Sequence, residues 1–115
     1  MADLGVDLVD LSSGGTAAKA QIPIGPGYQV PLAAQVKAES GVPTAAVGLI
    51  TDPAQASEIV AQDKSDAVML ARAALREPSW PQRAAHELGL SRSDTPYPQQ
   101  YTRGAWPREP VARSA

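Results

Sequence analysis

Short apolar runs alternate with amphipathic stretches along this chain. Val6–Leu11 alternates apolar and acidic residues and then meets Gly14 and Gly15, a pattern typical of a strand that ends in a glycine-rich turn. Two further apolar runs, 44–47 and 66–70, have the length and composition of short strands. The pattern therefore predicts strands and helices in alternation, with helices at 31–39, 53–62, 71–76 and 81–88.

The expected helices carry clear end signals. Asp52 is suited to cap a helix that begins at Pro53, and Gln55 stands three positions after the cap. Gly41 and Gly89 suit the left-handed position that closes a helix. The helix after Asp52 is expected to bury one face, formed by Ala56, Ile59 and Val60.

The order of these elements limits the fold class. Apolar strands that alternate with amphipathic helices indicate an α/β protein with parallel strands. Three such units are compatible with a piece of a barrel or with an open doubly wound sheet. Both architectures place their ligand site at the carboxyl ends of the strands. Residues 14–30, which are rich in glycine and proline, form a long loop at that end, and loops of this length are usually functional or disordered.

Composition then narrows the picture. The chain has 115 residues, 11 prolines and no phenylalanine, so it offers little bulky material for a core of its own. We therefore expect a piece of a larger assembly. A formal net charge of −2 gives no basic field for nucleic acid or an anionic membrane.

The sequence lacks the residues that several classes of functional site require. The chain has no cysteine, and its single histidine, His86, cannot form a metal site alone. No Gly-x-Ser-x-Gly motif surrounds Ser12 or Ser13, which more commonly satisfy backbone groups at a strand end. There is no run of 18 apolar residues and no signal-peptide pattern at the N-terminus, so a cytoplasmic protein is expected.

Five motifs together resemble one family. Each is weak alone, but their order and spacing from Gly5 to Trp106 are similar to the Old Yellow Enzyme family, in particular its bacterial, thermophilic-like ene-reductase branch. The motifs are Asp10–Gly14, Pro26–Gln29, Ala46–Ile50, Leu70–Arg72 continuing through Arg76–Pro78, and the tail Gln100–Trp106.

The resemblance implies a TIM (β/α)8 barrel that holds FMN. This chain would supply strands six, seven and eight with their helices, as a partial barrel over residues 1–95. Residues 96–115 would be a C-terminal tail that contacts another subunit. The missing N-terminal half of the barrel or a full-length subunit is the implied partner, and the intact family forms homo-oligomers.

The family implies an activity as well. NADPH or NADH reduces the flavin, which then reduces an activated, enone-like alkene. The His/His or His/Asn pair that anchors the substrate and the tyrosine that donates the proton precede strand six in the family. No catalytic residue of the family falls in this chain, so we expect a C-terminal fragment that is inactive alone. The alternative is a small non-enzymatic α/β binding or interaction module derived from the barrel.

A phosphate site is the chemistry expected of this segment. Gly48 permits close approach of a phosphate to the backbone, and the amides of Ala71 and Arg72 open a helix. The Arg72 guanidinium adds a charged, bidentate donor. The resemblance thus makes Gly48, Ala71 and Arg72 the ligands of the FMN phosphate, although an arginine at this place is, without the family context, more often an ordinary surface residue.

The chain departs from the family pattern at Ala71, and the resemblance implies a further role for Arg103. The family usually has glycine where Ala71 stands, and alanine tolerates a positive φ less well. In this branch of the family the tail reaches into a neighbouring subunit, which would make Arg103 a substrate-binding residue in trans.

Overall fold

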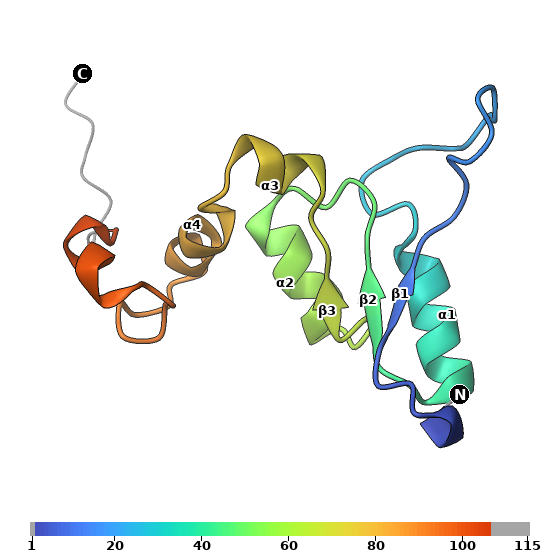
Figure 1. The fold of residues 1–115 in the computed structure, drawn as a ribbon, viewed down its shortest axis with the longest axis horizontal. Helices are drawn as coiled ribbons and strands as arrows, with labels where there is room; N and C mark the ends of the chain where they lie inside the picture. Colours follow the sequence, from blue (N-terminus) through green and yellow to red (C-terminus); the bar gives the residue numbers. More distant parts are fainter. Residues whose placement is uncertain (1, 107–115) are drawn as a thin grey trace.

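The computed structural model describes residues 2–106 and contains a three-stranded parallel sheet in the order β1-β2-β3 (Figure 1). The strands are β1 (Val9–Leu11), β2 (Thr44–Ala46) and β3 (Ala67–Val68). Val9 is in register with Thr44, and Ala45 with Ala67. The expected α/β class with parallel strands is confirmed. The strands are shorter than the apolar runs. In the first run, for example, only Val9–Leu11 pair with β2, and Val6–Leu8 do not.

Helices follow the strands as the sequence indicates. They are α1 (Val30–Ser40), α2 (Pro53–Ala61), the short α3 (Arg72–Arg76) and α4 (Trp80–Glu87). The Asp52 carboxylate accepts the Gln55 backbone N–H at 3.0 Å, so the cap at the start of α2 is confirmed. Gly41 closes α1 with a φ of 69°, and Gly89 follows the end of α4 with a φ of 81°. Short 3-10 helices occupy η1 (Ala2–Leu4) and η2 (Gln99–Gly104).

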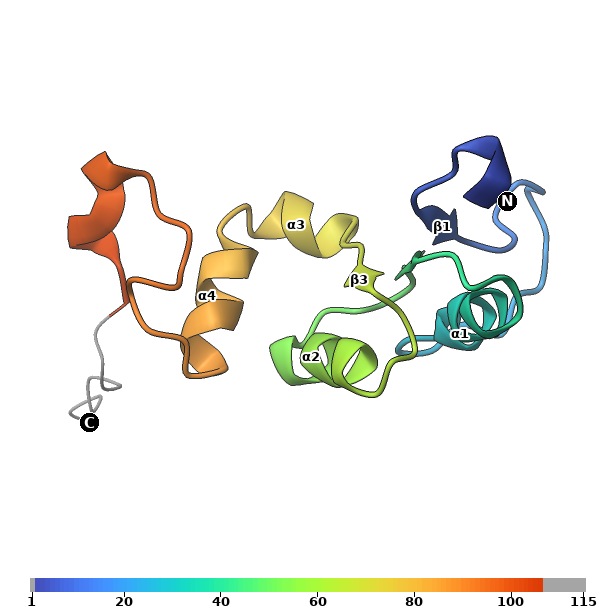
Figure 2. The same ribbon diagram turned by 90° about the horizontal axis from the view of Figure 1, so that it is seen from below.

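Helices α1 and α2 lie on the same side of the sheet (Figure 2). The core between these layers consists mostly of small residues, because β2 is buried at all three positions and two of them are alanines. Ala56 and Ile59 of α2 point into this core, as expected. Val60 does not: it is 43% exposed, so the predicted apolar face is narrower than the sequence pattern indicates. The core cluster is Val30, Ala33, Ala46, Ile50, Ala56, Ile59, Trp80 and Ala84.

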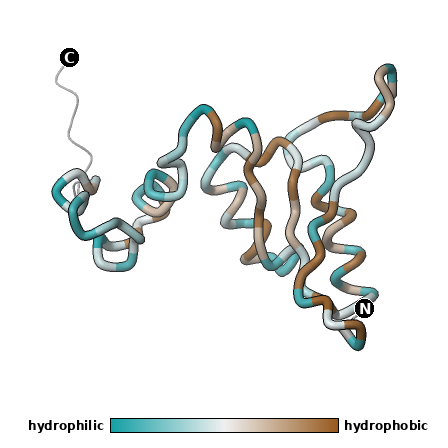
Figure 3. The backbone as a smooth tube through the Cα atoms, viewed as in Figure 1, coloured by the Kyte–Doolittle hydropathy of each residue, from teal (hydrophilic) through white to brown (hydrophobic). Residues whose placement is uncertain are grey.

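The C-terminal part extends away from the sheet. Helix α4 contacts α2 through Trp80, whose indole N–H donates to the Thr51 carbonyl at 2.8 Å, but η2 lies beyond α4 (Figure 1). The radius of gyration is 17.1 Å, against roughly 13 Å for a compact domain of about 100 residues. Apolar positions concentrate on the strands, whereas the chain after α4 is largely hydrophilic (Figure 3).

One domain boundary is not tested by the structure. A division between a partial barrel, 1–95, and a tail, 96–115, stays a prediction, and residues 107–115 lie outside the described part. Strands β1 and β3 form the two edges of the sheet, each with a single strand partner within residues 2–106.

None of the described helices is long and apolar enough to cross a bilayer.

Candidate functional site

A cavity opens at the carboxyl ends of β2 and β3, where the parallel sheet is expected to bind ligands. Its volume is about 320 Å³. The three residues that sequence motifs single out as cofactor ligands, Gly48, Ala71 and Arg72, all line it. Two segments that are distant in the sequence, the turn after β2 and the start of α3, therefore meet at one place.

Gly48 is held in a conformation that suits glycine. Its φ is +117°, and the next residue, Leu49, also has a positive φ of 50°. A Cβ at Gly48 would lie 2.8 Å from Cε1 of Tyr28 and 2.9 Å from Nε2 of Gln29. The Gly48 carbonyl accepts the Gly27 amide at 2.9 Å. Glycine is thus required here by the packing of the preceding loop, independently of any ligand.

Gln29 braces this end of the sheet, a role that motif analysis does not assign to it. The side chain is buried, with 4% of the residue exposed. Its Oε1 accepts the Ser13 backbone N–H, and its Nε2 donates to the Val47 carbonyl at 3.4 Å. One amide therefore links the chain after β1 to the chain after β2. Gln29 belongs to the motif Pro26–Gln29, but nothing in the sequence pattern shows that its side chain points inward.

Tyr28 lies beside Gln29 and lines the same cavity. Its ring packs against Gly48, since the ring carbons are the nearest atoms to a Cβ built there. The long loop at 14–30 thus returns to the carboxyl ends of the strands through its last residues. Its middle part projects away from the sheet (Figure 1).

Two arginines supply the positive charge at the cavity. Arg72 and Arg76, at the two ends of α3, both line it. Neither makes an ion pair within residues 2–106. Arg83 on α4 behaves differently: its guanidinium contacts both carboxylate oxygens of Glu77, at 2.6 and 2.9 Å, and this contact holds the pKa of Glu77 below its usual range.

Backbone donors are also free at the site. The amides of Gly48, Arg72 and Ala73 donate no hydrogen bond within residues 2–106. The helix α3 has only five residues, so its dipole contributes little to anion binding. Ala71 has a φ of −103°, so this position does not need the positive φ that alanine tolerates less well than glycine. The amides and the arginine side chains are the available anion donors.

Other sequence candidates lie elsewhere. Arg103 is an exposed residue of η2 and does not line the cavity at the sheet. His86 stacks its ring on Trp106 with the ring centroids 5.2 Å apart, so it packs the tail against α4. No group of three or more potential metal ligands occurs within residues 2–106.

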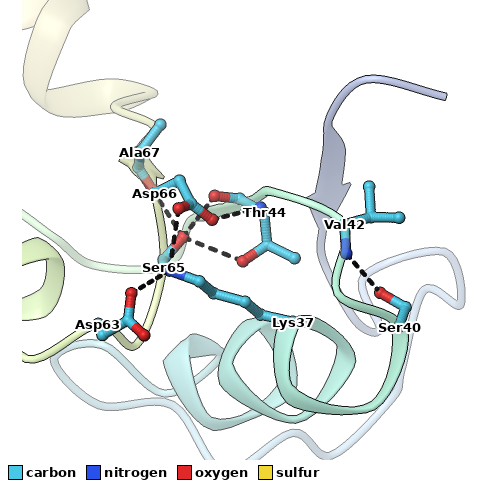
Figure 4. Close-up of polar contacts among 8 residues, drawn as sticks. All are labelled: Lys37, Ser40, Val42, Thr44, Asp63, Ser65, Asp66 and Ala67. Carbon is cyan, nitrogen blue, oxygen red and sulfur yellow. Dashed lines mark hydrogen bonds and ion pairs between the residues drawn. The ribbon is translucent and has the colours of Figure 1, made fainter. Parts of the chain in front are cut away.

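The amino ends of the strands carry a different polar cluster (Figure 4). The Ser65 hydroxyl lies 2.8 Å from both the Thr44 and the Ala67 carbonyl oxygens. The Asp66 carboxylate accepts the Thr44 amide at 2.9 Å and also contacts Lys37 Nζ at 2.9 Å. The contact with Lys37, together with the Thr44 amide, lowers the pKa of Asp66. This cluster ties α1, β2 and β3 together.

Comparison with known proteins bears on this geometry. Residues 1–91 match the NADH:flavin oxidoreductase / NADH oxidase family. The NADPH dehydrogenase of Halalkalibacterium halodurans is 49% identical over 102 residues, which are 89% of this chain and 29% of that protein. The NADPH dehydrogenase of Geobacillus thermodenitrificans is 49% identical over 104 residues, or 90% of this chain and 29% of that protein. The chain thus spans less than a third of the length of these relatives.

Proposed function

Because the chain belongs to the NADH:flavin oxidoreductase / NADH oxidase family, which is the Old Yellow Enzyme family of its motifs, we propose that it forms the part of an FMN-dependent oxidoreductase that holds the flavin phosphate. In this proposal β1, β2 and β3 are strands six, seven and eight of a TIM barrel. The remaining strands come from another polypeptide segment, either an N-terminal barrel half or a full-length subunit. The activity of the completed protein is NADPH- or NADH-driven reduction of activated alkenes, and the names of the relatives support NADPH as the donor.

One observation carries the proposal: Gly48, Ala71 and Arg72 line a single cavity at the carboxyl ends of the strands. The residues present fit a phosphate. The cavity offers unpaired amides at Gly48 and Arg72 and a guanidinium with no carboxylate partner in the described chain. Amides and an arginine that line one cavity are the kinds of donor that phosphate binding uses. In TIM barrels the loops after strands seven and eight frequently form such a site.

The chain's own contribution is binding and orientation. Bound FMN would supply the hydride chemistry. Arg72 and the amides would fix the phosphate end, while Gln29 and Tyr28 hold the turn at Gly48 in place. The cavity of about 320 Å³ has room for a phosphate group beside these residues.

The tail belongs to the same proposal. In a homo-oligomer of the completed enzyme, Arg103 would reach the substrate site of a neighbouring subunit. Its exposure and its place on η2, beyond α4, are compatible with a role outside its own chain (Figure 1).

Binding titrations with FMN and riboflavin test the proposal, because the two ligands differ only in the phosphate. The purified chain should bind FMN more tightly than riboflavin. A charge-assisted hydrogen bond contributes about 1.5–3 kcal/mol, so Arg72→Ala should weaken FMN binding by about 10- to 100-fold. Riboflavin binding should hardly change.

Salt and a matched variant sharpen this test. The Arg72 contribution should shrink at high ionic strength, because exposed charges are screened. Lys64→Ala removes a positive charge near the amino ends of the strands and should leave FMN affinity unchanged. An unchanged FMN dissociation constant for Arg72→Ala would mean that Arg72 does not bind the phosphate. If the chain binds neither flavin, the alternative of a non-enzymatic interaction module replaces the proposal.

A further inference from the structure

The two arginines of α3 form an unusual pair. Arg72 and Arg76 are four positions apart on the helix, which places like charges on neighbouring positions of one face, and both line the cavity that also includes Gly48. Like charges at this spacing destabilise a helix. Neither arginine has an ion-pair partner within residues 2–106. Both side chains are exposed, and no carboxylate of the described chain pairs with either of them.

The neighbouring carboxylates are engaged elsewhere. No aspartate or glutamate is among the described residues that line the cavity. Glu77 follows Arg76 directly but contacts Arg83 through both of its carboxylate oxygens. Asp52 follows the lining residue Thr51 but caps α2 through the Gln55 amide. The neighbouring carboxylates thus leave both guanidinium groups available to an anionic ligand.

We propose that Arg76 is a second anion ligand and that the cavity selects a dianionic phosphomonoester. This inference rests on the proposed function and deepens it, because it assigns two cations rather than one to the phosphate. Arg72 and Arg76 approach the ligand from α3, and the Gly48 amide approaches from the turn after β2. Two guanidinium groups match two negative charges, whereas a monoanion would leave one cation unpaired.

The dianion requirement gives the site a pH dependence. A phosphomonoester loses its second proton with a pKa of about 6, so it carries two charges at pH 7.5 and mostly one at pH 5. Tyr28 and the two arginines are the only ionisable side chains that line the cavity within the described chain. Neither histidine nor carboxylate is present there to titrate in that interval. The change in affinity between these pH values therefore reports the ligand's second charge.

The decisive variant is Arg76→Gln in the full chain, titrated with FMN, riboflavin and inorganic phosphate. We expect FMN binding to weaken by about tenfold at pH 7.5, as befits the loss of one charge-assisted contact. Arg76→Lys should recover part of the loss, because it restores the charge without the planar fork. The wild type should lose affinity for FMN from pH 7.5 to pH 5, and Arg76→Gln should lose less. Inorganic phosphate should bind the wild type and compete with FMN, which separates recognition of the phosphate from recognition of the flavin.

The outcomes separate the two proposals. Lys64→Gln is the control for a lost positive charge and should leave FMN affinity unchanged. If FMN binds the wild type and binding depends on Arg72 but is unaltered in Arg76→Gln, the second-ligand inference is wrong and the proposed function stands. If neither FMN nor phosphate binds the wild type, and the side-chain NMR signals of Arg72 and Arg76 do not shift with phosphate, both are wrong. Circular dichroism of each variant distinguishes weaker binding from lost structure.

Discussion

The two ends of the parallel sheet differ in how their polar groups are used. At the amino ends, Ser65 and Asp66 bind backbone groups of the strands directly, and Lys37 is paired with Asp66. At the carboxyl ends, Arg72 and Arg76 have no carboxylate partner within the described chain, and the turn at Gly48 adopts a positive φ. The polar groups at the amino ends bind the strands to one another, whereas those at the carboxyl ends are available to a ligand.

This division matches the general behaviour of barrel strands. Residues at the amino ends usually serve stability, while residues at the carboxyl ends bind ligands and carry function. Gln29 is the exception that joins the two roles, because it is a buried structural residue placed at the ligand end. The contrast therefore predicts that variants at the amino end affect stability alone, while variants near Gly48 and Gln29 affect both stability and binding.

The largest effect is expected at Gly48. In Gly48→Ala the new methyl group meets the Tyr28 ring and the Gln29 amide, and the backbone must keep a φ of +117°. Steric overlap and an unfavourable φ together should lower the free energy of unfolding by about 2–4 kcal/mol. Chemical denaturation measures this change. Gly25→Ala is the matched control, because no atom lies within 4 Å of a Cβ built at Gly25. Equal stability of the two variants would refute the packing role of Gly48.

Gln29→Leu should have the next largest effect. The substitution keeps the approximate volume but leaves the Ser13 amide and the Val47 carbonyl without a side-chain partner. We expect a loss of about 1–3 kcal/mol in the free energy of unfolding and weaker FMN binding, because the turn at Gly48 is no longer braced. Gln35→Leu changes an exposed glutamine of α1 that pairs with Glu39, and should change neither quantity appreciably. A Gln29→Leu chain with unaltered FMN affinity would confine Gln29 to stability.

Ser65→Ala probes the opposite end. The buried hydroxyl lies within hydrogen-bond distance of the carbonyl oxygens of Thr44 and Ala67, so its removal should lower the free energy of unfolding by about 1–2 kcal/mol. FMN affinity of the folded chain should not change. Ser57→Ala, an exposed position of α2, serves as the control. A loss of FMN affinity in Ser65→Ala, at equal fraction folded, would mean that the two ends of the sheet are coupled.

The smallest effect concerns pH and Asp66. Because its pKa is lower in the folded state than the ordinary value of 3.8, ionised Asp66 stabilises the fold above about pH 4. That contribution is lost as the pH falls through the folded-state pKa. Asp66→Asn should therefore be less stable than the wild type at pH 7, and the difference should shrink toward pH 3.

Urea denaturation at pH 7, 4 and 3 measures the contribution of Asp66. Asp7→Asn removes an exposed carboxylate that makes no hydrogen bond within residues 2–106 and should show no such convergence. A difference between wild type and Asp66→Asn that grows toward acid pH would contradict the stabilising role of the contact with Lys37.

Sequence patterns captured the order of elements and the helix ends, because these depend on local signals. The cap at Asp52 and the closing position of Gly41 are decided by neighbouring residues alone. The burial of Val60 was predicted wrongly, since the position of α4 against α2 decides which part of the α2 surface is covered.

The candidate site was predictable only in part. The turn at Gly48 and the arginine after β3 are visible as motifs, and parallel strands bring them to one end of the sheet. The inward direction of Gln29 and the packing of Tyr28 on Gly48 depend on how a long loop returns to the sheet, which has no local sequence signal. Arg76 was not assigned from the sequence, although the predicted helix at 71–76 already places it four positions after Arg72, and the structure shows that both line the cavity.

The hydrogen bond from Trp80 to Thr51 gives the protein an optical reporter. Thr51 lines the cavity, and the Trp80 indole donates to its carbonyl, so the indole is bonded to a residue of the proposed ligand site. Trp80 is buried, while Trp106, the only other tryptophan in the sequence, is 45% exposed. A Trp106→Phe chain would therefore emit from Trp80 alone. Its emission overlaps the near-ultraviolet absorption of flavins, so excitation transfer to a bound flavin would quench it and reveal occupancy without any attached label.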